Sequence, residues 1–259
     1  MLTLYDSPFS PFARKVRLAM DHKGLEAHTV DGLSKQAHAD LKSVNGRIEV
    51  PVLVDGSLTI VNSADIIAYL DHRYPDKPVL PADPAARVRA RAWERAADAT
   101  VDPILVNISY WLWAHRPDTM PDGLLDAARQ DLETVYQALE EELGADDFLC
   151  GALSVADLAL FPHLTATDFL DVAIDPGRFP KVTDWLKRLR NTAIGKADLE
   201  RARAYLSALD SHDVERTKLF WRGDRIEWLL ARGFHAWFAK EMKEDRVMWP
   251  GLGLPPSVN

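Results

Sequence analysis

Hydrophobic positions follow two different periods in the first part of the chain. Residues 11–24 and 63–74 repeat their apolar side chains at helical spacing. Four short apolar runs instead predict β-strands, at residues 2–5, 27–30, 50–54 and 58–61. The order strand, helix, strand predicts a parallel pair joined by a crossover. An Asp-Gly pair between the last two strands predicts a tight hairpin. This part of the chain is therefore expected to be α/β.

The pattern changes after the proline-rich stretch YPDKPVLPADPAA at residues 74–86, which breaks regular structure. Beyond it no run convincingly predicts a strand, and the apolar positions keep helical spacing. Five predicted helices follow, at residues 86–115, 122–144, 154–170, 181–194 and 196–209. The second part of the chain is therefore expected to be all-α.

Residues 211–259 form a further piece, with two predicted helices separated at Gly223-Asp224. Half of the tryptophans lie here, and so much aromatic area needs a surface to pack on. We expect the helical domain near the cleft to be that surface. The apolar side chains expected to pack there are Trp228, Leu229, Trp237 and Phe238. Four basic residues between them are expected to keep one face in water, namely Arg225, Arg232, Lys240 and Lys243.

Composition narrows the function classes. A chain of 259 residues with 47% hydrophobic and 27% charged side chains is typical of a globular protein. No apolar run approaches the roughly 20 residues that span a bilayer, so no membrane partner is expected. The first residues, MLTLYDSPFS, lack the features of a signal peptide. A net charge of -8 argues against a nucleic-acid partner.

Cysteine and histidine usage points away from metal and disulfide chemistry. Cys150 is the only cysteine, so an internal disulfide is impossible and a reducing cytoplasm is expected. Its apolar neighbours predict a packing role. Four histidines, His22, His28, His38 and His72, do not form a metal-ligand spacing. We therefore expect no metal.

Two Ser-Pro pairs precede the helix predicted from residue 11. Ser10 suits the N-cap and Pro11 the first helical position. If the helix began at Pro8, Pro11 would stand where the first helical N–H is needed. Ser10 is therefore expected at the helix mouth, beside unpaired N–H groups that stabilise an anion such as a thiolate. Spacing alone leaves open whether Ser10 only caps the helix or also takes part in chemistry.

Two more positions could contact a ligand. Val50-Pro51 opens a hairpin strand, and its peptide bond is either trans or cis. A cis bond would expose the backbone N–H and C=O of Val50 to an extended peptide. Asn62-Ser63 starts a helix, where its groups either cap the helix or hold a carboxylate.

Two other motifs are assigned structural roles. Ser154-x-x-Asp157 predicts a capping box at a helix start. Three arginines recur every fourth residue on one helical face, Arg87, Arg91 and Arg95. We expect that face to be solvated or to contact another subunit rather than to bind an anion.

In their order along the chain these motifs resemble a cytosolic glutathione transferase of the Ser/Cys type. The matching segments are Ser10-Pro-Phe-Ala-Arg-Lys-Val-Arg, Val50-Pro51-Val-Leu, Asn62-Ser63, the proline-rich linker and FLCGALSVAD. The resemblance covers about residues 1–205. It implies a thioredoxin-like N-terminal domain that binds glutathione, an all-α C-terminal domain that helps to bind the electrophile, and a homodimer. The implied division is a thioredoxin-like domain at 1–78, a linker at 79–86, a helical domain at 87–210 and an aromatic-rich helical extension at 211–259.

The resemblance also implies roles for individual residues. Ser10 matches the residue next to the sulfur of glutathione, the co-substrate, and Arg14 would add positive potential there. The backbone of Val50, before Pro51, matches the residue that pairs with the cysteinyl part. Ser63 matches the serine that receives the γ-glutamyl carboxylate. Three aromatic residues are expected at the electrophile site, with core packing as the alternative for each: Phe9, Tyr110 and Trp113.

Two residues of the expected glutathione site depart from the family pattern. Glu49 stands where the family often has Lys or Gln near the glycine carboxylate. Asn62 stands where an acidic residue usually faces the γ-glutamyl ammonium. Arg47 and Asp65 are candidates to compensate.

Two kinds of function stay open at this point. One is a detoxifying transferase that activates the thiol for attack on a small hydrophobic electrophile. Ether cleavage, isomerisation, dehalogenation and peroxide reduction would use the same site. The other is a glutathione transferase-like protein kept for binding or as a scaffold, without turnover.

Overall fold

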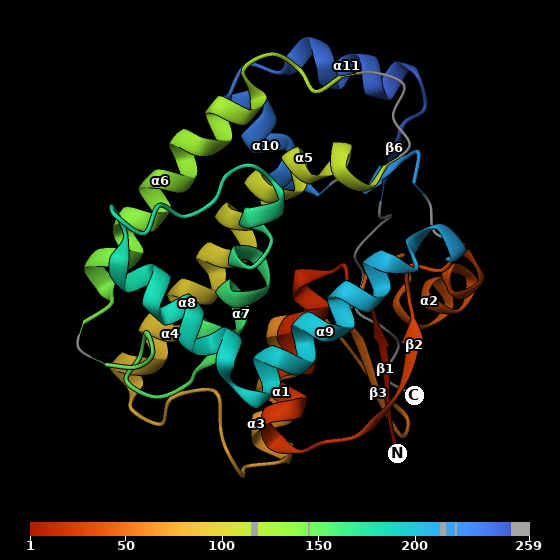
Figure 1. Cartoon of the computed structure of the whole chain (residues 1–259). Coiled ribbons are helices and arrows are strands. Elements are labelled where there is room, and N and C mark those ends of the chain that lie inside the picture. The colour runs from red at the N-terminus through yellow and green to blue at the C-terminus, as the bar shows by residue number, and fades with distance from the viewer. Residues whose placement is uncertain (115–118, 145, 213–215, 221, 250–259) are drawn as a thin grey trace.

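The computed structural model describes residues 1–114, 119–144, 146–212, 216–220 and 222–249. Within these ranges an α/β domain is followed by a helical domain and by a C-terminal extension that returns to the helical domain (Figure 1). The expected fold class, thioredoxin-like followed by all-α, is confirmed. None of the helices described is both long and apolar enough to cross a bilayer.

The central sheet of the α/β domain has four strands in the order β2-β1-β3-β4. They are β1 (Leu2–Asp6), β2 (Ala27–Asp31), β3 (Val52–Asp55) and β4 (Leu58–Val61). The register pairs Leu4 of β1 with Thr29 in parallel and with Leu53 in antiparallel orientation. The predicted strands, crossover and hairpin are therefore confirmed.

Three helices pack around this sheet: α1 (Pro11–Lys23), α2 (His38–Asn45) and α3 (Ser63–Arg73). α1 and α3 cover the face toward the helical domain, and α2 lies on the other side of the strands (Figure 1). α1 packs directly on α7 and α9 of the helical domain. The sequence pattern missed α2 because this short helix buries only one large apolar side chain, Leu41.

The helical domain is built around a helix that is buried along its whole length. Its helices are α4 (Pro84–Ala96), α5 (Asp102–Trp113), α6 (Leu124–Glu142), α7 (Val155–Leu164), α8 (Pro180–Asn191) and α9 (Ala193–Ser207). Every residue of α7 is buried, and the predicted capping box of Ser154 and Asp157 starts it. Asp157 also accepts hydrogen bonds from Leu149 N at 3.1 Å and from Trp185 Nε1 at 2.8 Å. The box therefore ties α7 to the loop before it and to α8.

The single helix predicted at residues 86–115 is instead two α-helices joined by a π-helical turn, Ala97–Val101. Pro103 explains the break, because it has no N–H to bond to the carbonyl four residues earlier and its ring would clash with that carbonyl. α4 itself begins at Pro84, inside the stretch interpreted as a linker.

The C-terminal extension contains α10 (Gly223–Ala231), α11 (His235–Lys243) and two short strands, β5 (Leu219–Phe220) and β6 (Val247–Met248). These strands form a two-stranded parallel pair, which the prediction of helices alone had missed. α10 packs on α5, and Leu229 and Phe238 are 0% and 5% exposed (Figure 1). The expected packing on the helical domain is therefore confirmed.

The basic residues of the extension differ from expectation in one respect. The Arg225 side chain is only 12% exposed, and its Nε lies 2.9 Å from Asp102 Oδ2 on α5. Arg232 pairs with Asp131 of α6, which also accepts from Trp228 Nε1 at 2.8 Å. Both arginines therefore fix the extension to the helical domain, and only Arg225 departs from the expected wet face, because Arg232, Lys240 and Lys243 are exposed.

Candidate active site

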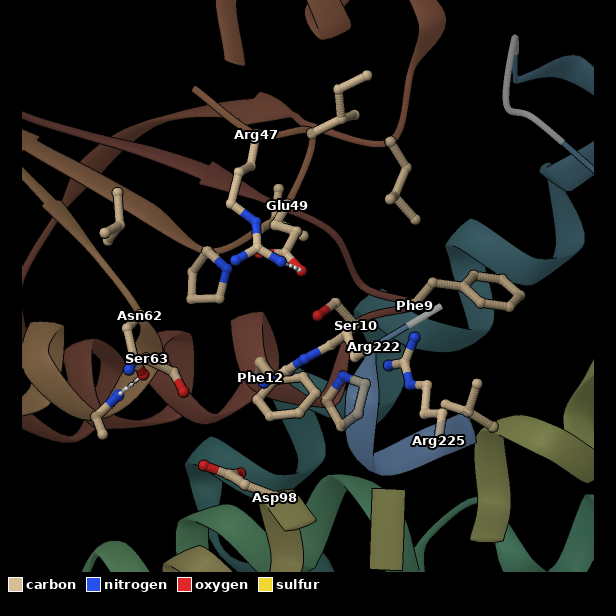
Figure 2. A pocket seen from close by; sticks show the side chains of 18 of the residues that line it. Phe9, Ser10, Phe12, Arg47, Glu49, Asn62, Ser63, Asp98, Arg222 and Arg225 are labelled. Atoms are coloured by element: carbon tan, nitrogen blue, oxygen red, sulfur yellow. Dashed lines mark hydrogen bonds and ion pairs between the residues drawn. The ribbon is translucent and has the colours of Figure 1, made fainter. Parts of the chain in front are cut away.

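A cavity of about 720 Å³ opens between the α/β domain, the helical domain and the extension. The loop before α1, the segment before β3 and the start of α3 form one side of it, and α4, α5 and the extension form the other (Figure 2). The cavity brings together most of the predicted site residues: Phe9, Ser10, Glu49, Val50, Pro51, Asn62, Ser63 and Trp113.

Ser10 is the N-cap of α1, as predicted, with extended backbone angles of φ -88 and ψ 116. Its Oγ accepts a hydrogen bond from Ala13 N at 3.3 Å. No acceptor for the hydroxyl proton of Ser10 occurs in the part of the chain that the structure describes. The hydroxyl therefore caps the helix and keeps its O–H available to a group inside the cavity.

The Val50–Pro51 peptide bond is cis, one of the two alternatives considered. Across the described residues, no hydrogen bond uses the backbone N–H or C=O of Val50. Gly32 packs against Val50, and a Cβ at Gly32 would lie 2.3 Å from Val50 Cγ1. The backbone of Gly32 is itself fixed by a hydrogen bond from its N–H to Asp6 O at 2.8 Å. The absence of a side chain at Gly32 thus leaves room for Val50 at the cavity edge.

The start of α3 presents Asn62 and Ser63 on the far side of the cavity from the extension (Figure 2). Asn62 caps the helix from a left-handed conformation, φ 72, and its Oδ1 accepts from Ala64 N at 3.1 Å. Ser63 is buried at the first helical position, and Asp65 also lines the cavity. Capping and ligand binding are compatible here, because the other first-turn N–H groups stay available.

Glu49 does not present an uncompensated negative charge. Its carboxylate lies 3.0 Å from Arg47 Nε, and Arg47 Nη2 donates to Glu49 Oε1 at 3.1 Å. Both side chains line the cavity (Figure 2). The departure from the family pattern at this position is therefore an internal ion pair.

Arg14 lies outside the cavity, contrary to expectation. Its Nη2 is 2.6 Å from Asp198 Oδ2 of α9, and its Nη1 donates to Pro162 O at 3.0 Å. The Arg14 and Asp198 side chains are 10% and 2% exposed. The positive charge is neutralised between the two domains, so it adds little potential at Ser10.

Tyr110 is also placed in the core, the alternative considered for each aromatic residue. It is 0% exposed, and its hydroxyl donates to Thr217 O at 2.8 Å. Trp113, one helical turn later, does line the cavity, and its ring centroid lies 6.0 Å from that of Phe9. Tyr110 therefore supports Trp113 from behind rather than facing the cavity.

Tyr205 of α9 is a cavity residue that the sequence pattern did not single out. Its ring centroid lies 5.8 Å from that of Phe9, and its hydroxyl donates to Asp31 Oδ2 at 3.0 Å. Burial, together with the neighbouring Asp31 carboxylate, raises the pKa of Tyr205, so it stays neutral. Phe9, Trp113 and Tyr205 form the aromatic wall of the cavity.

Charged residues of α4 also line the cavity. Their position changes the interpretation of the helical face that carries Arg87, Arg91 and Arg95. Arg91 and Arg95 line the cavity instead of facing only solvent or another subunit. Arg91 Nη1 lies 2.6 Å from Glu94 Oε2. Their periodic spacing was visible in the sequence, but the surface that this helical face meets depends on how α4 packs.

Asp98 lines the cavity at the π-helical turn after α4. Burial raises the pKa of Asp98, and the neighbouring Lys15 opposes this shift. Lys15 Nζ lies 2.7 Å from Asp98 and 3.0 Å from Glu94. The two carboxylates therefore share a cation that comes from α1 and does not itself line the cavity.

No group of three or more His, Cys, Asp or Glu side chains arranged for a metal occurs within the described ranges. The groups that the described lining offers are hydroxyls, backbone N–H and C=O groups, an aromatic wall and charged side chains.

Comparison with family models gives two matches. Residues 4–78 match the model described as the N-terminal domain of glutathione S-transferase, and residues 122–188 match the model of its C-terminal domain. Both models end before the extension.

Two curated relatives match over most of their length. A probable maleylacetoacetate isomerase of Vibrio cholerae is 30% identical over 203 residues, covering 73% of this chain and 91% of the relative. Glutathione S-transferase U2 of Arabidopsis thaliana is 25% identical over 193 residues, covering 71% of this chain and 82% of the relative.

A solved structure of a glutathione S-transferase also superposes on this chain. Glutathione S-transferase isozyme E7 of Drosophila melanogaster superposes with a TM-score of 0.67 at 25% identity, covering 83% of this chain and 98% of that one.

Proposed function

Given that the chain belongs to the glutathione S-transferase family, we propose that it acts as a transferase whose cavity binds glutathione and activates the thiol for attack on an electrophile. The observation that carries the proposal is the Ser10 hydroxyl, held at the N-terminus of α1 with its O–H available toward the cavity.

Three neighbouring features fit the other parts of glutathione. The unpaired backbone groups of Val50 suit the cysteinyl peptide groups. Ser63 and the first-turn N–H groups of α3 suit the γ-glutamyl carboxylate. Asp65 lines the cavity at the same helix start and suits the γ-glutamyl ammonium. Arg47 suits the glycine carboxylate even while it is paired with Glu49.

In the proposed reaction Ser10 donates a hydrogen bond to the sulfur, and the dipole of α1 stabilises negative charge there. Lowering the pKa of a thiol from about 8.5 by roughly two units corresponds to about 2.7 kcal/mol of thiolate stabilisation. The aromatic wall of Phe9, Trp113 and Tyr205 offers the electrophile an apolar surface beside Ser10. Conjugation is the reaction that requires no further group.

The test combines calorimetry of glutathione binding with the ultraviolet absorption of the bound thiolate as pH is varied. We expect wild-type protein to bind glutathione and to lower its thiol pKa, and Ser10→Ala to bind glutathione but to lose most of that shift. Ser34→Ala is the matched control, because Ser34 caps the turn Lys35–Ala37 outside the cavity. An unchanged titration in Ser10→Ala would show that Ser10 is only a cap.

A binding or scaffold protein without turnover is the second candidate, and the neutral Asn62 favours it. Glu49 no longer does, because Arg47 compensates its charge. Failure to bind glutathione at millimolar concentration would favour this second candidate.

We further propose that the protein acts as a homodimer in the cytoplasm, in detoxification, as other members of the family do.

A further inference from the structure

The cavity is more basic than the rest of the chain. Among the residues that the structure describes, six arginines and four carboxylates line it, in a protein whose net charge is -8. The arginines are Arg47, Arg91, Arg95, Arg216, Arg222 and Arg225. Three of them come from the described residues of the extension, 216–220 and 222–249, among which no carboxylate lines the cavity.

Most of these arginines already have a carboxylate partner. Arg47 pairs with Glu49, Arg91 with Glu94, and Arg225 with Asp102. Arg216 pairs with Asp210 and also donates its Nε–H to Trp113 O at 2.8 Å. These cations therefore support the cavity wall, and their charge is largely balanced within the protein.

Two lining arginines, Arg95 and Arg222, have no paired carboxylate in the portion of the chain that the structure describes. Arg95 is exposed, whereas Arg222 is partly buried. Its guanidinium carbon lies 4.7 Å from the centroid of the Phe12 ring. Stacking on an aromatic face leaves the N–H groups at the edge of the guanidinium free to bind an anion. Arg222 lies near Ser10 and Phe12 in the cavity (Figure 2).

Arg222 is also held on a fixed element. Three residues later, Arg225 is bonded through its side chain to Asp102, and its backbone oxygen accepts from Asn107 Nδ2 at 3.1 Å. Both partners belong to α5. The position of Arg222 is therefore preorganised, which lowers the entropic cost of binding an anion.

We infer that Arg222 binds a carboxylate group carried by the electrophile, so that the preferred second substrate is an aromatic acid. This inference rests on the proposed function of the cavity. Ser63 and Arg47 offer sites for the two carboxylates of glutathione on the α/β side. Arg222 instead comes from outside both matched family models, which end at residues 78 and 188. A residue of the extension is therefore suited to recognise a group, here a carboxylate, that is specific to the second substrate of this protein.

Calorimetry with a matched pair of product conjugates tests the inference without requiring turnover. The pair is the glutathione thioethers formed from 4-chloro-3-nitrobenzoate and from the corresponding benzamide. In this reaction the C–S bond forms at the carbon that bears chlorine, chloride leaves with the electron pair, and the thiol proton goes to solvent. The glutathione part is common to both conjugates, so their difference in affinity reports the carboxylate alone.

We expect wild-type protein to bind the acid conjugate about 10-fold more tightly than the amide, the typical effect of one hydrogen-bonded charge pair. Arg222→Gln should remove this difference while changing the affinity for the amide conjugate and for glutathione less than about twofold. Arg222→Lys should keep part of the preference. Lys240→Gln is the charge control, because Lys240 is exposed on α11 outside the cavity and its change should leave the preference intact.

Three results would overturn the inference. Equal wild-type affinity for the two conjugates would show that no group recognises the carboxylate. An equal loss for both conjugates and for glutathione in Arg222→Gln would assign Arg222 to glutathione or to the stability of the cavity. Binding of neither conjugate would remove the proposed function together with the inference. Discrimination between the conjugates by a protein that does not lower the pKa of the glutathione thiol would leave the inference standing and the transferase proposal in question.

Discussion

The guanidinium of Arg14 and the carboxylate of Asp198 form a buried ion pair between the α/β domain and α9, with Nη2 2.6 Å from Oδ2. Asp198 is 2% exposed, and the same guanidinium also donates to Pro162 O on α7. The two domains are thus joined by a charge pair that excludes water directly behind the helix that presents Ser10. Removing one partner leaves the other charge buried and unpaired.

Asp198→Ala should lower the free energy of unfolding by about 3–5 kcal/mol, the range observed when one partner of a buried pair is removed. Urea denaturation measures this free energy of unfolding. Replacing both residues, Arg14→Met with Asp198→Leu, should cost much less, because no unpaired charge remains. If the single variant were as stable as wild type, the pair would not hold the domains together.

Glu49→Gln should tighten glutathione binding several-fold, because it releases Arg47 from its internal partner to face the glycine carboxylate. A gain of about 1 kcal/mol is expected for a partly exposed site. Calorimetry at low and high salt measures the effect, which should shrink as salt screens the charge. Arg47→Gln is the opposing variant and should weaken binding. Weaker binding in Glu49→Gln would mean that Glu49 itself contacts the ligand.

Gly32→Ala should weaken glutathione binding about 10-fold or more, because the new Cβ would lie 2.3 Å from Val50 Cγ1 and displace Val50 at the cavity edge. Calorimetry measures it. Gly144→Ala is the matched control, since nothing lies within 4 Å of a Cβ there. Wild-type affinity in Gly32→Ala would show that the position of Val50 is not needed for binding.

The buried imidazole of His163 predicts a pH-dependent stability. Burial lowers the pKa of His163 from 6.5 to about 4. Between these values the unfolded chain binds a proton that the folded chain does not, so stability falls as pH drops from about 6.5 toward about 4. At about pH 5 the loss due to this group should be about 2 kcal/mol.

The measurement is the difference in unfolding free energy of the wild type between about pH 7.5 and pH 5, compared with His163→Gln. The variant cannot take up this proton, so its stability should fall less on acidification. Parallel losses in both proteins would show that other groups cause the acid sensitivity.

A chain that ends after Leu209 should be much less soluble, because it uncovers the surface of α5 on which α10 packs, including the fully buried Tyr110. It retains Ser10, Val50 and Ser63, so its glutathione affinity should stay within about twofold of the full chain. Light scattering and calorimetry measure these properties. A fully soluble truncated protein would show that the extension is a peripheral appendage.

Residues whose role is local were predictable from the sequence. Ser10 and Pro11 specify a helix start through their own hydrogen-bonding capacity, and Ser154 and Asp157 do so for α7. Such signals act over a few residues and do not depend on how the rest of the chain packs.

Residues whose role depends on packing were not predictable. Arg14 is one helical turn from Ser10, yet its side chain turns toward Asp198 in the other domain. Arg222 is far from Ser10 in sequence and reaches the same cavity only because α10 folds back on α5. Tyr110 and Trp113 lie three residues apart, yet Tyr110 is buried in the core and bonded to Thr217 O, whereas Trp113 lines the cavity.

The π-helical turn at Ala97–Val101 has a consequence for how the cavity could change during evolution. Cavity residues precede it on α4 and follow it on α5 as Val106, Ser109 and Trp113. A π-turn holds one residue more than a regular turn, and each residue rotates an α-helix by about 100°. A regular helix here would need one residue fewer, for example loss of the exposed Thr100, together with replacement of Pro103, which has no N–H to continue the helix. Because the π-turn holds its extra residue within about one turn, α5 would keep nearly the same orientation against α4, and the arginines and the aromatic wall would stay in phase.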